Sequence, residues 1–113
     1  MLTIEKLAEF GADTGKGLER CMNNEAFYLR LVGMTAEDGN FSKLESAIRE
    51  NDLDTAFEAA HALKGTTGNL SLDPIFDPVC EITELLRART PMDYTEKLDL
   101  IMTKLEELKN LIG

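Results

Sequence analysis

Apolar residues recur along most of the chain at intervals of three and four, which is the spacing of one face of an α-helix. Alternating runs of β-branched residues, which are typical of strands, are absent. The pattern therefore predicts an all-α fold. The segment from Asp93 onward shows the clearest stripe, made of Leu98, Ile101, Met102, Leu105, Leu108 and Ile112.

Turn-forming residues divide the first half of the chain into shorter helices. A short opening helix is predicted around Leu7, and segment 11–17, which contains three glycines, should interrupt the chain after it. Asn23 or Asn24 can cap the next helix, whose apolar residues are Phe27, Leu31 and Met34. The cluster Asp38-Gly39-Asn40 separates or kinks this helix from one that carries Phe41, Leu44 and Ile48.

The central helix is predicted to follow Asn51-Asp52 and to run from Leu53 to the region 69–71. Two Asp-Pro pairs come next, Asp73-Pro74 and Asp77-Pro78. Each has the form of a capping acid followed by proline in the first helical turn, so both remain possible starts for the following helix.

The end of the chain completes the predicted fold. Thr90-Pro91 should stop the preceding helix, and Asp93 should open the final one. Helices of these lengths, joined by short turns, predict an antiparallel four-helix bundle with a short additional N-terminal helix or helices. We expect a single domain over residues 1–113, because the chain is too short for two ordinary cores.

The charge balance limits the classes of partner. Asp and Glu number 21 against 12 Lys and Arg, which gives a formal net charge of −9 at pH 7. Such a surface repels nucleic-acid backbones and anionic membranes. No run approaches the about 20 apolar residues of a membrane span, and the start lacks a signal-peptide pattern. We therefore expect a soluble, cytoplasmic protein that binds neither nucleic acid nor membrane.

The only histidine, His61, lies within the predicted central helix. At about 100° per residue, the apolar positions of this helix gather in one direction, and His61 projects about 140° away from their centre. A lone helical histidine is most often a core or rim residue with a satisfied hydrogen bond. The outward direction argues against that interpretation and predicts an imidazole that faces solvent.

Three neighbours of His61 extend the pattern. Gly65 and Gly68 follow one and two turns later on the same face, although an interior glycine costs a helix about 1 kcal/mol relative to alanine. Gly68 could belong to the helix end and Gly65 could serve close packing, but Gly65 points outward. Lys64 is near enough for its ammonium to reach a group on the ring. The four residues predict an exposed nucleophile, a cation for phosphoryl oxygens and bare backbone that another protein can approach.

The segment His61-Ala62-Leu63-Lys64-Gly65, followed by Leu70, resembles the signature of histidine-containing phosphotransfer (HPt) domains. That signature is His, any residue, Leu, Lys, Gly and later Leu-Gly. Weaker similarity extends through most of the chain, from residues 27–29 through 53–60 to the helical hairpin after the histidine. One position departs, with Ser71 where the family usually has glycine, and this affects the expected helix ending rather than the phosphoacceptor.

The resemblance implies a carrier without autokinase activity. His61 would accept a phosphoryl group from the phosphoaspartate of a receiver domain, in a response regulator or hybrid sensor kinase, and pass it to another receiver. Lys64 would stabilise the phosphoryl oxygens, while Gly65 and Gly68 would border the partner. The protein would be a monomer with no cofactor or metal of its own, and magnesium would belong to the receiver. A second helix in the family often offers a polar side chain to the histidine, for which Thr83, or adjacent Glu84, is the candidate by position.

Other chemistries fit the residues less well. Glu58 and His61 have the Glu-x-x-His spacing of carboxylate-bridged di-metal bundles, but such a site needs inward-facing side chains and a second histidine. Cys21 and Cys80 lack metal-site spacing and are expected to be unpaired, buried thiols. A hydrolase triad cannot be assembled around one exposed histidine. The remaining alternative is an adaptor that binds a partner through the same surface without being phosphorylated.

Overall fold

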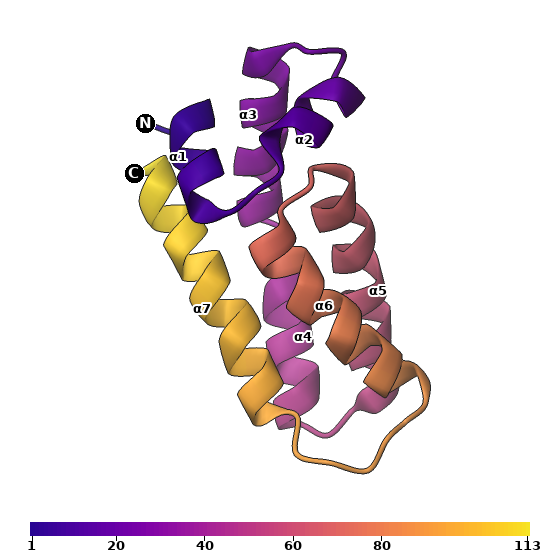
Figure 1. The fold of residues 1–113 in the computed structure, drawn as a ribbon. Coiled ribbons are helices and arrows are strands. Elements are labelled where there is room, and N and C mark those ends of the chain that lie inside the picture. Colours follow the sequence, from indigo (N-terminus) through magenta and orange to yellow (C-terminus); the bar gives the residue numbers. More distant parts are fainter.

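The computed structural model describes residues 1–113, which form seven helices and no strands (Figure 1). This result confirms the predicted all-α class. The helices are α1 (Ile4–Phe10), α2 (Thr14–Arg20), α3 (Glu25–Ala36), α4 (Asn40–Arg49), α5 (Leu53–Asn69), α6 (Asp73–Arg87) and α7 (Thr95–Ile112). None of them is both long and apolar enough to cross a membrane.

Helices α4 to α7 run alternately up and down as an antiparallel bundle (Figure 1). The most extensive packing joins α5 to α6 and α4 to α5. Helix α3 lies beyond the end of α4, so that the two form one broken arm, while α1 and α2 pack around the upper end of the molecule. The predicted four-helix bundle with additional N-terminal helices is therefore confirmed.

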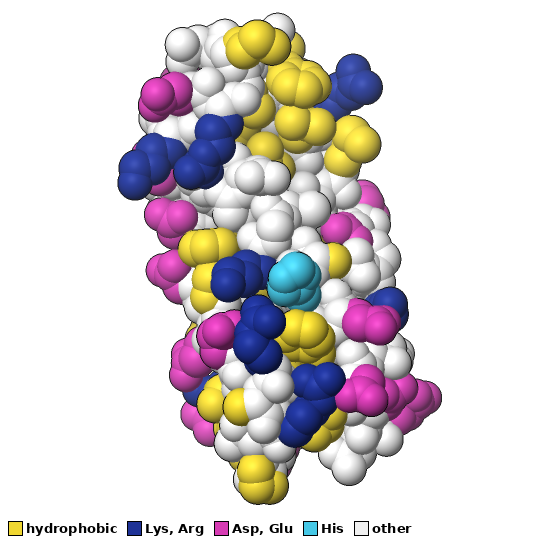
Figure 2. All heavy atoms as spheres, turned by 90° about the vertical axis from the view of Figure 1, so that its right-hand side faces the viewer, with side chains coloured by type: hydrophobic (Ala, Val, Ile, Leu, Met, Phe, Trp, Pro, Cys, Tyr) yellow, Lys and Arg dark blue, Asp and Glu magenta, His cyan; other side chains and the backbone are white.

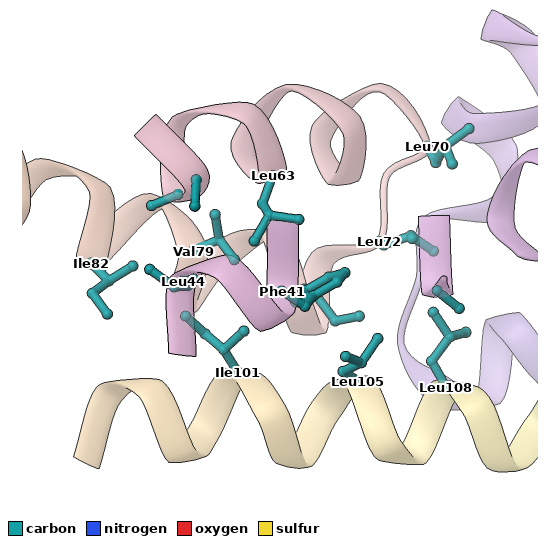
Figure 3. Close-up of a cluster of buried hydrophobic side chains, with 14 of the residues drawn as sticks. Phe41, Leu44, Leu63, Leu70, Leu72, Val79, Ile82, Ile101, Leu105 and Leu108 are labelled. Carbon is teal, nitrogen blue, oxygen red and sulfur yellow. The ribbon is translucent and has the colours of Figure 1, made fainter. Parts of the chain in front are cut away.

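Buried apolar side chains from the four bundle helices meet between them (Figure 3). Phe41 and Leu44 of α4 face Ile101 and Leu105 of α7, with Val79 of α6 beside them. The apolar stripe predicted for the last helix is confirmed, with Met102 and Ile112 half-buried and its other four residues buried. In the same bundle, one face of α5 packs against the core, and its opposite face is exposed to solvent.

Of the predicted apolar residues of α3, only Leu31 packs against the core, and it is half-buried. Phe27 is 39% exposed and Met34 is 59% exposed, whereas Tyr28, Val32 and Ala36 are buried. Both sets have helical spacing, so periodicity alone could not distinguish them. The buried set is decided by the position of α3 against its neighbours.

The glycine-containing segment 11–17 is a shorter interruption than predicted. Only residues 11–13 separate α1 from α2, and α2 includes two of the glycines. A Cβ added at Gly17 would lie 2.5 Å from the Tyr28 ring, so this glycine allows α2 to approach α3. The segment thus combines a turn, where Gly11 has φ of 111°, with a helix–helix contact.

Of the two predicted helix starts with a capping side chain, one is confirmed and the other is not. The Asn24 side chain accepts a hydrogen bond from the Phe27 N–H at 3.0 Å, at the start of α3. Asp93 accepts from the Thr95 N–H at 2.9 Å, but it lies one residue before the cap position of α7, which is Tyr94, and no side chain caps this helix. Each carboxamide or carboxylate thereby satisfies a backbone donor that has no partner inside its helix.

Helix α6 begins at the first of the two Asp-Pro pairs. Pro74 lies in the first turn, where its missing N–H has no intrahelical partner to lose. Pro78 lies inside the helix and not at its start. The first pair is therefore the helix start, and the second is a proline that the helix accommodates.

Candidate functional site

His61 lies in the middle of α5, on the face that points away from the bundle. The buried residues of α5 are Ala56, Ala59, Ala60, Leu63 and Thr67. His61 itself is exposed, as its angular position predicts. The helix is held in this rotation by its apolar face, so the same packing that buries one stripe presents the imidazole to solvent.

A surface hollow of about 450 Å³ contains His61. Its lining brings together all four residues of the sequence pattern and adds three others: Arg20, His61, Lys64, Gly65, Gly68, Asn69 and Phe76. The hollow is therefore formed by α2, α5 and α6 together. Arg20 had no signal in the sequence, because it lies 41 positions before His61 and reaches the hollow only through the packing of α2.

The two glycines of the hollow have different roles. A Cβ added at Gly65 would meet nothing within 4 Å, so the surface there is open, as predicted. A Cβ at Gly68 would lie 2.8 Å from Cε1 of Phe76 on α6. Gly68 lines the hollow, but it also allows the Phe76 ring to pack on α5, which corrects the interpretation of Gly68 as cleared surface alone.

An aromatic ring lies beside the imidazole. Phe57 precedes His61 by one helical turn, and its ring centroid lies 5.7 Å from that of His61. The guanidinium carbons of Arg87 and Arg89 lie 5.0 and 5.3 Å from the Phe57 centroid. Both distances are within the range of a cation–π contact. Phe57 therefore connects the histidine to two cations at the C-terminal end of α6.

Several basic side chains lie near the histidine although the protein is acidic overall. Figure 2 shows lysine and arginine side chains to the left of and below the single histidine, and others farther away at the upper left, with acidic side chains toward the left and right edges. Lys64 and Arg20 both line the hollow. Arg87 and Arg89 lie next to it, with their guanidinium groups over the ring of Phe57. This face therefore attracts anions more strongly than the net charge of −9 suggests.

Arg20 is anchored at the C-terminal end of α5. Its Nη1 donates hydrogen bonds to the carbonyl oxygen of Gly68 at 2.6 Å, to that of Asn69 at 3.4 Å, and to Oγ of Ser71 at 3.0 Å. The last carbonyls of a helix lack intrahelical donors and carry partial negative charge. Arg20 therefore closes this helix end while remaining exposed to solvent.

The Ser71 position explains where the chain departs from the HPt signature. Its backbone has φ of 54°, in the left-handed region that favours glycine. The residue is buried, and its hydroxyl accepts the hydrogen bond from Arg20. Serine therefore adds an anchoring contact that glycine lacks, and α5 still ends at Asn69.

Thr83 does not contribute to this surface, so its prediction as a partner-binding residue is wrong. It is fully buried, and its hydroxyl donates to the Val79 carbonyl at 2.6 Å within α6. Neighbouring Glu84 is exposed and forms an ion pair with Arg87 at 3.1 Å. The sequence did not define how α6 is rotated about its own axis. That rotation buries Thr83 and exposes Glu84.

Cys80 is the residue of α6 whose thiol lies near the Lys64 charge. Burial raises the pKa of the Cys80 thiol, and the nearby Lys64 ammonium acts in the opposite direction. Cys80 is half-buried rather than buried, while Cys21 is buried as predicted, and both thiols are free. On α6, the side chain near the Lys64 ammonium is therefore the free thiol of Cys80.

A family model described as Hpt domain matches residues 35–111. The chain belongs to the Hpt domain family. Hpt domains are helical histidine carriers of phosphorelays, and they interact with receiver domains of response regulators. The match includes His61, Lys64 and Gly65, whereas Arg20 lies outside it. No curated protein and no solved structure gives a match to this chain.

Proposed function

We propose that His61 accepts a phosphoryl group from the phosphoaspartate of one receiver domain and passes it to the aspartate of another. The observation that carries this proposal is the exposure of His61 in a hollow shared with Lys64 and open Gly65. The nucleophile, a cation and an approach for a second protein are all present on one face of α5.

The reaction needs little from this chain beyond position and charge. An unprotonated nitrogen of the His61 ring attacks the phosphorus in line and forms the N–P bond. The electron pair of the breaking P–O bond goes to the aspartate, which leaves as a carboxylate. Lys64 balances the charge of the phosphoryl oxygens, and the open backbone at Gly65 lets the donor aspartate reach the ring. Magnesium is proposed to be bound by the receiver.

The phosphoacceptor is tested with receiver domains that have been charged with labelled acetyl phosphate. Wild-type protein should acquire acid-labile, base-stable phosphate, and His61→Gln should acquire none. The variant should keep the helical circular dichroism and melting temperature of wild type, because the side chain is exposed. Label that persists in His61→Gln would overturn the assignment, and a large loss of stability would indicate a structural histidine.

A second experiment tests the proposal that the chain has no kinase chemistry of its own. Labelled ATP alone should leave the purified protein unlabelled, because the sequence has no glycine-rich phosphate loop. Labelling by ATP without an added kinase would contradict the carrier role. Tight binding of receivers without any transfer to His61 would instead favour a non-phosphorylated adaptor.

A further inference from the structure

We infer that Arg20, positioned by Ser71, is a partner-recognition residue that binds an acidic side chain of the incoming receiver domain. The inference rests on the proposed function. It adds to that function a specificity contact from α2, which lies outside the region matched by the family model.

The anchoring of Arg20 leaves much of its guanidinium available. All three hydrogen bonds to Gly68, Asn69 and Ser71 use Nη1. A guanidinium carries five N–H donors in a planar fork, so Nε and Nη2 can still bind a carboxylate. Because the side chain is already held, less conformational entropy is lost when a partner binds than with a freely moving lysine.

The backbone of Ser71 gives independent support. Its φ of 54° is unfavourable for residues other than glycine or asparagine, yet the position carries a buried serine. The serine hydroxyl is used for the bond to Arg20. The Ser71 carbonyl also accepts from the Asp13 N–H at 3.0 Å, just before α2 begins. Position 71 thus fixes both α2 and the arginine that α2 carries.

The distance along α5 separates the role of Arg20 from that of Lys64. Lys64 follows His61 by three residues, which is about 4.5 Å along the helix axis, and its ammonium can reach a phosphoryl group on the ring. Gly68, where Arg20 is anchored, follows by seven residues, or about 10 Å. Arg20 therefore lies at the rim of the hollow, where the surface of the partner rather than the phosphoryl group would contact it.

The test compares Arg20→Gln with Lys16→Gln, which removes a neighbouring exposed cation of α2 that does not line the hollow. Transfer from a panel of acetyl-phosphate-charged receiver domains is followed as the receiver concentration is varied. Arg20→Gln should raise the half-saturating concentration about fivefold or more and weaken its salt dependence, while the rate at saturation changes less than about twofold. Lys16→Gln should match wild type.

A small phosphodonor separates docking from chemistry. When His61 is labelled by phosphoramidate, the ring nitrogen takes the phosphoryl group and ammonia leaves, so no protein contact is needed. Arg20→Gln should affect receiver-driven transfer far more than this labelling, whereas Lys64→Gln should slow both. Wild-type protein that takes no label on His61 from phosphoramidate or from any charged receiver would show that the proposed function itself has failed.

Ser71→Gly provides a second variant that preserves the fold. Glycine accepts the left-handed backbone, so the melting temperature should not fall by more than a few degrees. Loss of the hydroxyl should raise the half-saturating concentration in the same direction as Arg20→Gln, and the double variant should be no worse than Arg20→Gln alone. Unchanged half-saturation in Arg20→Gln, or equal slowing of phosphoramidate labelling, would overturn the inference.

Discussion

The ring of Phe57 lies one helical turn before His61 on α5, with the two ring centroids 5.7 Å apart and the planes tilted by 39°. The guanidiniums of Arg87 and Arg89 contact the same Phe57 ring. Arg89 is held in turn by Asp54, with Nη2 2.7 Å from the carboxylate. The phenyl ring therefore has fixed neighbours, and it limits the orientations that the exposed imidazole can adopt.

Phe57→Leu should slow labelling of His61 without unfolding the bundle. Leucine keeps an apolar contact but removes the flat ring that orients the imidazole, and misplacement of a reacting group lowers rates steeply. We expect a decrease of roughly tenfold in the rate at saturating receiver. Phe10→Leu, another half-buried phenylalanine but on α1, is the matched control. Equal rates in Phe57→Leu and wild type would show that the ring contact does not position His61.

Gly65 should respond in opposite directions for stability and for transfer. A Cβ meets nothing at this position, so Gly65→Ala should raise the free energy of unfolding by about 0.4 to 1 kcal/mol, measured by urea denaturation. Gly65→Gln should also fold. Its longer side chain would block the receiver, so transfer should slow sharply from Ala to Gln. Transfer from Gly65→Gln at the wild-type rate would refute the docking surface beside His61.

Gly68→Ala should instead destabilise the protein. The added methyl group would lie 2.8 Å from the Phe76 ring, and crowding of this kind costs about 1 to 3 kcal/mol, which outweighs the about 0.4 to 1 kcal/mol gained by replacing a helical glycine. The double variant Gly68→Ala with Phe76→Leu should recover part of this loss, because leucine vacates the space that the ring edge occupies. Urea denaturation of the two variants and of Phe76→Leu alone measures the coupling. Gly68→Ala that is as stable as wild type would contradict the packing role.

Asp52 should make the stability of α5 depend on pH. Hydrogen bonds from the Thr55 hydroxyl and backbone N–H lower the Asp52 pKa from its usual value of 3.8. A lowered folded-state pKa means that the stabilisation is complete above the unfolded pKa and is lost as the pH falls through the folded value.

The difference in melting temperature between wild type and Asp52→Ala should therefore be largest above about pH 5 and should shrink as the pH falls toward about 2. Asp99→Ala, which removes an exposed aspartate inside α7, is the control for general acid effects. A difference for Asp52→Ala that stays constant across this range would contradict the charged cap.

Local patterns in the sequence were sufficient to predict much of the geometry around His61. The helical period predicts that His61 points outward and that Gly65 and Gly68 share its face, because these relationships depend only on the geometry of one helix. The cap at Asn24 and the turn at Asp93 are also local, since each side chain bonds the backbone within three residues. Such interactions form in the same way whatever surrounds the helix.

The prediction for Thr83 failed because it concerned the orientation of one helix relative to another. Its spacing from His61 was compatible with a contact, but α6 is rotated so that the hydroxyl is buried against Val79. The same reason applies to α3, where the exposed Phe27 and the buried Tyr28 are adjacent in sequence. Amphipathic spacing defines an axis of burial only when one apolar stripe is clearly stronger than its alternatives.

The sequence by itself determined the helical class, the family signature and the outward direction of the single histidine, because each follows from residues within about two turns of one another. Only the tertiary structure decided that Arg20 reaches the hollow, that Phe76 packs on Gly68, and that Phe57 links His61 to Arg87 and Arg89. Each of these contacts joins residues in or next to two different helices. Their geometry depends on how the core side chains interlock to set the rotation and spacing of each helix, which no single helix encodes.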